Sequence, residues 1–310
     1  ARGFKVGLNF ELPKYVYLTS LGTSWNLENL QVLYQETYLT NIFVRVLSQN
    51  TEYNQAEVDS AAAELTGSIS KSTNSTNTLL SLNFGANKTN NYTFPNNGYK
   101  AHILLANANF LQYLSNIVFN SELERPLYYK VQLDFSVFPK LYFSKENAFG
   151  IKFRVGNIYV YEGSESAIPY NQRFTSGGSN SIRGWQSRDL VPEFNFGEID
   201  FPSLSPSELE SIFLDQATPG GLFQLEGSIE TRNRLIGKIG TALFLDYGNT
   251  WANAKAFRFD EIAISAGFGF RYYTDFIPFR IDFAVKLYDP NSRVIIVHLH
   301  FCNYLLSNIS

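Results

Sequence analysis

Few residues in this sequence are of the types that carry out covalent or metal chemistry. The 310-residue chain contains one cysteine and three histidines. In "HLHFC" the alternation of a strand would place His298, His300 and Cys302 on one face, which could suggest a metal site, but no carboxylate partner accompanies them. Such a set is more often structural, and no Ser-His-Asp set, nucleotide loop or nucleophile elbow is recognisable. We therefore expect a protein that is not an enzyme and that has no catalytic residue, metal or cofactor.

The residues with the most distinctive chemistry lie in "RFTSGGSNSIRGWQSRDLVP", residues 173–192. The glycines and the Ser-Asn-Ser run predict a loop, yet a charged and a bulky residue flank a further glycine, as if the loop enters something. A guanidinium that loses part of its hydration needs carboxylates to accept its forked N–H groups, and a glycine lets the backbone approach a wall closely. The alternative is a solvated loop arginine. The residues of this candidate motif are Gly177, Gly178, Arg183, Gly184 and Trp185.

The elements that would position this loop follow a period-two pattern. In "KIGTALFLDYG" (238–248), Leu243 falls on an aliphatic and aromatic face and Asp246 on the opposite face. In "FQLEGSIETR" (223–232), Glu230 falls on the polar face. "IAISAGFGFRYY", "FRIDFAVKL" and "FGIKFRVG" alternate in the same way. The pattern predicts antiparallel strands of about ten residues each.

The composition favours a membrane barrel over a soluble β-sandwich, which also alternates. A sandwich exposes Lys, Glu, Thr and Ser to water, whereas the polar faces here carry glycines and mixed charges, which suit a confined interior. Aromatic residues make up 16% of the chain, and tyrosines cluster towards strand ends as in an aromatic girdle. The sequence contains no run of about 18 consecutive apolar residues, so it predicts no transmembrane helix. A membrane barrel would also lack such a run, because its strands alternate. The net charge of −3, without a basic cluster, argues against nucleic-acid binding.

Turn signals recur along the chain, and no linker divides it into two domains. In total we expect about 12 to 14 strands, and residues 55–68 fit either a strand or a short helix. The longest irregular segment, residues 162–220, contains the loop and a capping-box pattern that predicts a short helix at 205–216. Strands are expected at about 4–12, 29–39, 41–49, 78–91, 100–111, 129–138, 147–161, 221–232, 237–248, 261–273, 279–288 and 294–304.

In combination these motifs resemble those of the BamA/TamA superfamily of outer-membrane β-barrel proteins. The loop signature of that family is an Arg-Phe, a Gly-Gly and then Val-Arg-Gly-Phe, to which "RFTSGGSNSIRGW" is similar. "GSIETR" and "ALFLDYGNTW" resemble the two strands that follow this loop, the second through Phe244, Asp246 and Gly248. "FPNNGY" and "GFGFRYYTDFIPFRIDFA" resemble a turn before the central strands and the penultimate hairpin.

The resemblance implies an all-β, transmembrane antiparallel barrel of 16 strands, with a long lumenal loop, in the bacterial outer membrane. It implies that Arg183 meets Glu230 and Asp246 on the barrel wall, which would clamp the loop; the alternation independently places both acids on the lumen face. POTRA domains precede the barrel in this family. No POTRA-like stretch is present here, so we expect one barrel domain over residues 1–310, incomplete at its N terminus.

The implied function is assembly or translocation, in which other outer-membrane proteins are inserted or exported through a lateral seam beside a loop-plugged lumen. The implied partners are the lipid bilayer, client outer-membrane or secreted proteins, and periplasmic or lipoprotein subunits, but no nucleic acid. Two alternatives stay open: a two-partner-type secretion pore, and a passive barrel that anchors another domain. The family usually ends on a strand with a terminal aromatic residue, whereas this chain ends in "VIIVHLHFCNYLLSNIS".

Overall fold

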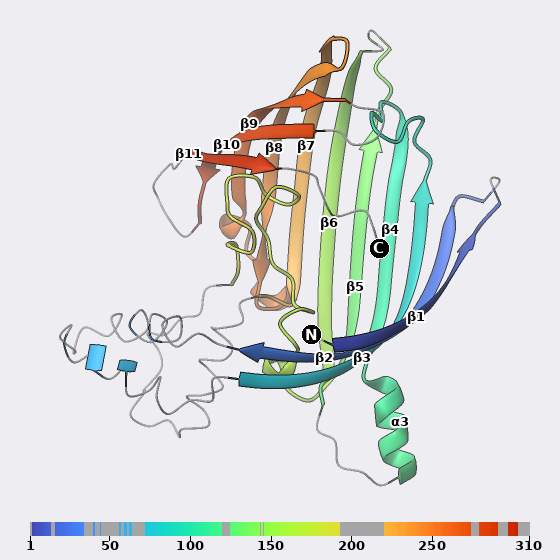
Figure 1. Ribbon diagram of the computed structural model, residues 1–310, viewed down its shortest axis with the longest axis vertical. Coiled ribbons are helices and arrows are strands. Elements are labelled where there is room, and N and C mark those ends of the chain that lie inside the picture. Colours follow the sequence, from blue (N-terminus) through green and yellow to red (C-terminus); the bar gives the residue numbers. More distant parts are fainter. Residues whose placement is uncertain are drawn as a thin grey trace.

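A single antiparallel sheet dominates the fold (Figure 1). The computed structural model describes residues 2–13, 16–33, 72–119, 125–142, 146–192, 220–273, 279–290 and 297–302, and a few single positions between them. These residues form one 11-stranded sheet, in which every strand pairs with the next strand along the chain. The strands are β1 (Arg2–Glu11), β2 (Ser20–Leu33), β3 (Ser72–Asn87), β4 (Gly98–Ala108), β5 (Leu127–Phe138), β6 (Asn147–Glu162), β7 (Phe223–Ile236), β8 (Ile239–Trp251), β9 (Ala263–Tyr272), β10 (Phe279–Tyr288) and β11 (Val297–Cys302).

The sheet is strongly curved, and the segment that follows β6 runs along its concave side (Figure 1). β1 and β11 are the two edges of the sheet in the described part of the chain. Among the described residues, three single-turn 3-10 helices lie in the connections: η1 (Glu165–Ala167), η4 (Ala254–Ala256) and η5 (Phe259–Glu261). Because consecutive strands are antiparallel, the connections after β4, β6 and β8 all lie at one end of the sheet.

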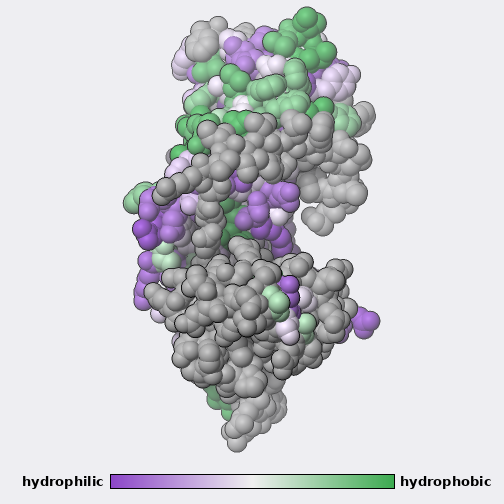
Figure 2. Space-filling view, turned by 90° about the vertical axis from the view of Figure 1, so that its left-hand side faces the viewer, coloured by the Kyte–Doolittle hydropathy of each residue, from purple (hydrophilic) through white to green (hydrophobic). Residues whose placement is uncertain are grey.

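The predicted period-two alternation is confirmed in β8, β9 and β10. On the convex face Leu243 is 60% exposed and Phe268 is 48% exposed, and the Phe268 ring stacks on Phe283 with 5.0 Å between centroids. On the concave face Ala242 and Asp246 are fully buried. Apolar side chains therefore point outward and polar side chains inward, which is the reverse of a soluble sheet with one solvated face. Figure 2 shows the side on which β9 to β11 lie, with hydrophobic residues gathered above a hydrophilic band.

All nine strands predicted from residue 78 onward are present as β3 to β11, with shifted ends; β3 begins earlier, at Ser72. The strand expected at 4–12 is β1, and the one expected at 29–39 overlaps the second half of β2. The described residues thus contain 11 strands, against about 12 to 14 expected. The segments 41–49 and 55–68 lie almost entirely outside the described residues, and the helix expected at 205–216 lies wholly outside them.

The sequence prediction missed helix α3 (Phe110–Phe119), because it continued the preceding strand to residue 111. The strand ends at Ala108, and Asn109 takes a positive φ of 60°, which few residue types tolerate. Its amide Nδ2 donates to Pro126 O at 2.9 Å and its Oδ1 accepts from Thr78 N at 2.9 Å, so this one side chain fixes the turn. Within the described part of the chain, no helix is long and apolar enough to cross a membrane.

Candidate functional site

In its described residues, the loop after β6 has two parts, which we call the loop base (residues 163–174) and the loop tip (residues 175–190). The tip is a compact hairpin, closed by paired backbone hydrogen bonds between Ser176 and Leu190 of 3.0 and 3.1 Å. Gly177 and Gly178 turn the chain at φ values of +103° and +95°, where a side chain would be strained. Ser181 Oγ accepts from Gly177 N at 2.9 Å. These contacts orient the next residues of the tip, Arg183 to Trp185, towards the inner wall of the sheet.

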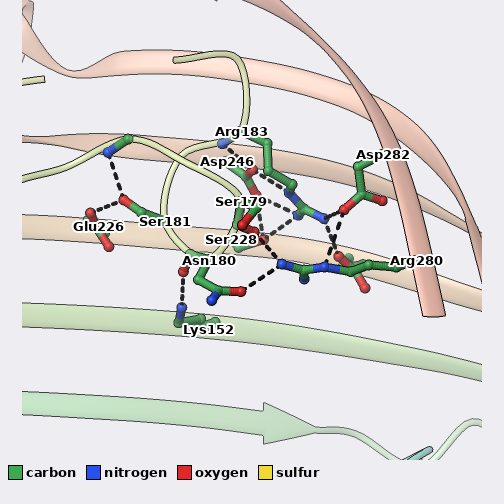
Figure 3. A network of polar contacts seen from close by, with 12 residues as sticks. Lys152, Ser179, Asn180, Ser181, Arg183, Glu226, Ser228, Asp246, Arg280 and Asp282 are labelled. Carbon is green, nitrogen blue, oxygen red and sulfur yellow. Dashed lines mark hydrogen bonds and ion pairs between the residues drawn. The ribbon is translucent and has the colours of Figure 1, made fainter. Parts of the chain in front are cut away.

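Arg183 is 4% exposed and meets both acids that the resemblance assigns to it. Its Nε lies 2.7 Å from Asp246 Oδ2 and its Nη2 lies 2.8 Å from Asp246 Oδ1, so the two side chains form a bidentate pair. Its Nη1 lies 2.7 Å from Glu230 Oε2. The backbone N–H of Arg183 also donates to Asp246 Oδ2, at 3.1 Å. The structure therefore brings together Arg183, Glu230 and Asp246, which we call the clamp. Figure 3 shows Arg183 beside Asp246.

The strand registers explain how the clamp forms. Asp246 lies opposite Ser228 on β7 and opposite Ser265 on β9. Glu230 is two residues from Ser228 and therefore on the same face of β7. Small residues beside Asp246 leave space on the inner wall into which the loop tip fits.

Three further wall residues contact Arg183 and were not found from the sequence. Asp282 Oδ2 on β10 lies 3.4 Å from Nη1, and Ser228 Oγ lies 3.3 Å from Nη2. The Phe244 ring stacks on the guanidinium, with 3.4 Å from Cζ to the ring centroid. Asp282 falls on the polar face of "FRIDFAVKL", so the alternation could have revealed it. Phe244 was noted only as a residue that carries the family resemblance, and nothing in that motif assigns this inward aromatic ring to the arginine.

Gly184 and Trp185 seat the tip against β9 and β10. A Cβ at Gly184, whose φ is +122°, would lie 3.1 Å from Ser265 Cβ, so a larger residue would push the tip off the wall. Trp185 is 2% exposed and packs with Ile182, Leu190 and Ala263 in one apolar cluster. Lys286 Nζ lies 4.8 Å from the Trp185 ring centroid, within cation–π range.

Basic residues on the wall hold the end of the tip through its oxygens. Arg280 Nη2 donates to Ser179 O and to Asn180 Oδ1, both at 2.6 Å. Lys152 Nζ on β6 donates to Asn180 O at 2.9 Å. Figure 3 shows these residues converging on the tip from different strands. The tip is thus hydrogen-bonded to strands β6 to β8 and β10.

The clamp is an electrostatic network rather than an isolated pair. Arg232 Nε lies 2.7 Å from Glu230 Oε1, and Arg271 Nη1 lies 2.5 Å from Asp282 Oδ1. Burial alone would lower the pKa of the Arg183 guanidinium, but its hydrogen bonds to Asp246 and the nearby acidic charges raise that pKa, so the side chain stays cationic. Removing one member of such a buried network leaves the others without a counter-charge, which is costly.

The loop base is attached to the other half of the sheet. Ile168 and Phe174 join an apolar cluster whose further members come from β3 to β6 and from Leu222. Lys130 Nζ on β5 donates to Gln172 O at 2.7 Å. Glu28 on β2 accepts from Asn171 Nδ2 at 2.9 Å and from Gln172 Nε2 at 3.0 Å.

No group of three or more His, Cys, Asp or Glu residues that could hold a metal ion occurs among the described residues. The backbone of β11 carries His298, His300 and Cys302, but the side chains of this strand lie outside the described part of the structure. The chemistry that the described site offers is therefore ionic and hydrogen-bonding.

The chain belongs to the Omp85 superfamily, whose domain matches residues 2–302, which confirms the resemblance drawn from the sequence motifs. Among solved structures, the barrel is similar to BamA from Haemophilus ducreyi lacking POTRA domains 1–3, with a TM-score of 0.59 and 16% identity; the match covers 96% of this chain and 52% of that one. CdiB from Acinetobacter baumannii matches with a TM-score of 0.49 and 10% identity, over 93% of this chain and 39% of that one.

Membership of this superfamily settles two properties of the chain. Omp85 proteins are outer-membrane β-barrels that reside in the bacterial outer membrane. They are transport and assembly proteins rather than enzymes. The chain spans about half the length of the BamA chain that it matches.

Proposed function

We propose that this chain is an assembly-type barrel, which inserts or exports other outer-membrane proteins without covalent chemistry or a nucleotide. In this proposal the wall is completed to 16 strands and closes through a weak lateral seam between its first and last strands. Unpaired backbone groups at such a seam can template an incoming strand. Client outer-membrane or secreted proteins, together with periplasmic or lipoprotein subunits, are the proposed partners.

The observation that carries the proposal is the burial of Arg183 against carboxylates from three strands of the wall, β7, β8 and β10. A passive pore does not need a loop cation that fits its wall in this way. We assign the clamp the role of keeping the lumen plugged and the wall shaped. Gly177 and Gly178 shape the tip, Gly184 permits its close approach to the wall, and Trp185 packs beside it.

The experiment that tests this function is a reconstituted insertion assay. The full chain is placed in liposomes, and a small outer-membrane barrel unfolded in urea is added. The measurement is the fraction of client that migrates as folded protein on unheated gels over time. We expect insertion to be faster than in empty liposomes. Arg183→Ala should slow it while the variant's own barrel stays folded, since a strand ladder holds the wall.

A matched control is Arg188→Ala, which removes the same side-chain type from an exposed position of the same loop tip. It should leave the insertion rate unchanged. The competing functions give different results. A secretion pore would carry an unfolded soluble polypeptide into the vesicles without inserting the client, and a passive barrel would do neither. Either result would overturn the proposal.

A further inference from the structure

A cavity of about 400 Å³ lies beneath the loop tip, between Ser179–Ser181 and the inner faces of β5, β6, β7 and β10. Pro95, Phe138 and Ala148 also line it. Phe138 ends β5 and Ala148 lies at the start of β6, so this part of the cavity is at the end of the sheet opposite to the loop base. We place the connection after β6 on the extracellular side of the membrane, so the opposite end of the sheet faces the periplasm, the side from which a client chain arrives.

The lining of this cavity is strongly cationic. Its charged members are Lys152, Arg154, Arg183, Arg232, Arg280 and Glu230, five cations and one carboxylate. The other carboxylates that balance these cations do not line the cavity. Asp134 and Glu226 pair with Arg154, while Asp246 pairs with Arg183. A group that enters the cavity therefore meets guanidinium and ammonium groups first.

The chemistry of these groups selects an oxyanion. Guanidinium groups offer planar forks of N–H donors that match a carboxylate, and low-dielectric walls strengthen the attraction. The volume is near the lower end of the range for pockets that enclose a ligand, so it suits a few side chains rather than a folded domain. Acidic side chains on an extended segment would reach it from the periplasmic end.

We infer that this cavity binds the carboxylate side chains of an acidic, unfolded client segment beneath the seated loop tip. The inference deepens the proposed function by naming the chemical class of segment that the lumen receives. Arg232 is the residue that tests it with the least direct effect on the loop, because its described contacts are with Glu230 and not with the loop. Since Glu230 also contacts Arg183, hydrogen exchange in residues 176–186 is measured on each Arg232 variant to show that the tip stays seated. Lys152 and Arg280 also hold the tip, so their replacement would change two properties at once.

The test is a binding measurement on the full chain in lipid nanodiscs, read by fluorescence anisotropy. Two labelled peptides of equal length are compared, in which Thr alternates with either Glu or Gln. We expect the Glu peptide to bind about tenfold more tightly, and Arg232→Gln to weaken it by about tenfold, as the loss of one favourable charge contact of this kind allows. Raising NaCl should weaken the Glu peptide only, because salt screens charges over about 10 Å.

Two variants control for folding and for total charge. Arg232→Lys keeps the positive charge and should retain most of the affinity for the Glu peptide. Arg258→Gln removes an exposed positive charge at η5, at the opposite end of the sheet, and should change nothing. Equal binding of the Glu and Gln peptides, or equal effects of Arg232→Gln and Arg258→Gln, would overturn the inference. So would displacement of the Glu peptide by inorganic phosphate at concentrations below that of the peptide, which would identify a phosphate site.

This experiment and the insertion assay fail independently. Insertion without preference for the Glu peptide overturns the cavity assignment alone. Preference for the Glu peptide without insertion overturns the assembly function alone.

Discussion

The base and the tip of the loop after β6 are attached to different strands by different forces. Apolar contacts on β3 to β6 hold the base, and the Phe174 ring packs directly over Gly156 of β6. Ionic contacts on β7, β8 and β10 hold the tip, with Arg183 at their centre. Apolar packing is non-directional and tolerates substitutes of similar volume, whereas a buried charge network depends on particular atoms at particular distances. We therefore expect the base to stay attached while the tip can bind to the wall or leave it.

The largest expected effect is that of Arg183→Ala at the tip. It leaves Glu230 and Asp246 without their shared cation, and breaking a buried pair costs about 3–5 kcal/mol. Hydrogen exchange should rise in residues 176–186 but not in the loop base. Arg183→Lys should restore the protection only in part, because an ammonium cannot form the bidentate pair. Unchanged exchange in Arg183→Ala would show that apolar packing around Trp185 holds the tip instead.

The second effect in size concerns Phe174→Ala at the base. Phe174 is 6% exposed, and truncating a core phenylalanine costs about 3 kcal/mol or more. Exchange should rise in residues 165–174 while residues 180–186 stay protected. Phe174→Leu should cost less than about 1.5 kcal/mol, because apolar packing accepts a similar volume. If either Phe174 variant released the tip as well, the base and the tip would be one cooperative unit and the comparison would fail.

An intermediate effect distinguishes backbone strain from loss of the clamp. Gly184 at the tip and Gly163 at the base both have positive φ, +122° and +92°, and an added Cβ would lie 3.1 Å from a neighbour at each site. Alanine at either position should cost about 1–3 kcal/mol through local strain. Only Gly184→Ala should also lower the insertion rate, because it displaces Arg183. Equal loss of insertion in both variants would mean that the whole loop, and not the clamp, controls activity.

The smallest effect is expected for Glu28→Gln, which changes an ionisable contact of the base with β2. An amide keeps one oxygen as acceptor, so the loss should be below about 1 kcal/mol, near the value of a single neutral hydrogen bond. The melting temperature and the exchange of the loop tip should match those of the unmodified chain. A loss as large as that of Arg183→Ala would show that the base, too, depends on charge.

The sequence was most informative where the signal is local. Period-two alternation placed Leu243 outward and Asp246 inward, because successive side chains of a strand point to opposite faces. The resemblance then paired Arg183 with Glu230 and Asp246, and the geometry brings these three residues together. Helix α3 was missed although Phe110, Tyr113, Leu114 and Ile117 have helical spacing, because the preceding apolar strand leads into them without a break.

Other contacts of the site could not be predicted from the sequence, because they join residues that are far apart along the chain. Glu28 is 143 residues from Asn171, and no spacing rule connects two such positions. The stacking of Phe244 on Arg183 depends on Gly267, above which the ring lies, so three separate segments must be in place before the contact exists. The end of β4 depended on the Asn109 turn, which acts through Thr78 and Pro126.

The contact of Glu28 with the loop base has a mechanical consequence, because it makes the loop connect two distant strands. One continuous segment is fastened to β2 at Gln172 and to β8 at Arg183, so it acts as a tie across the inside of the curved wall. Fully extended, the chain between those two residues reaches no more than roughly 40 Å. If the wall widens, the tie first unfolds its hairpin and then comes under tension. The weaker of the two attachments then breaks first. The state of the loop therefore depends on the width of the lumen.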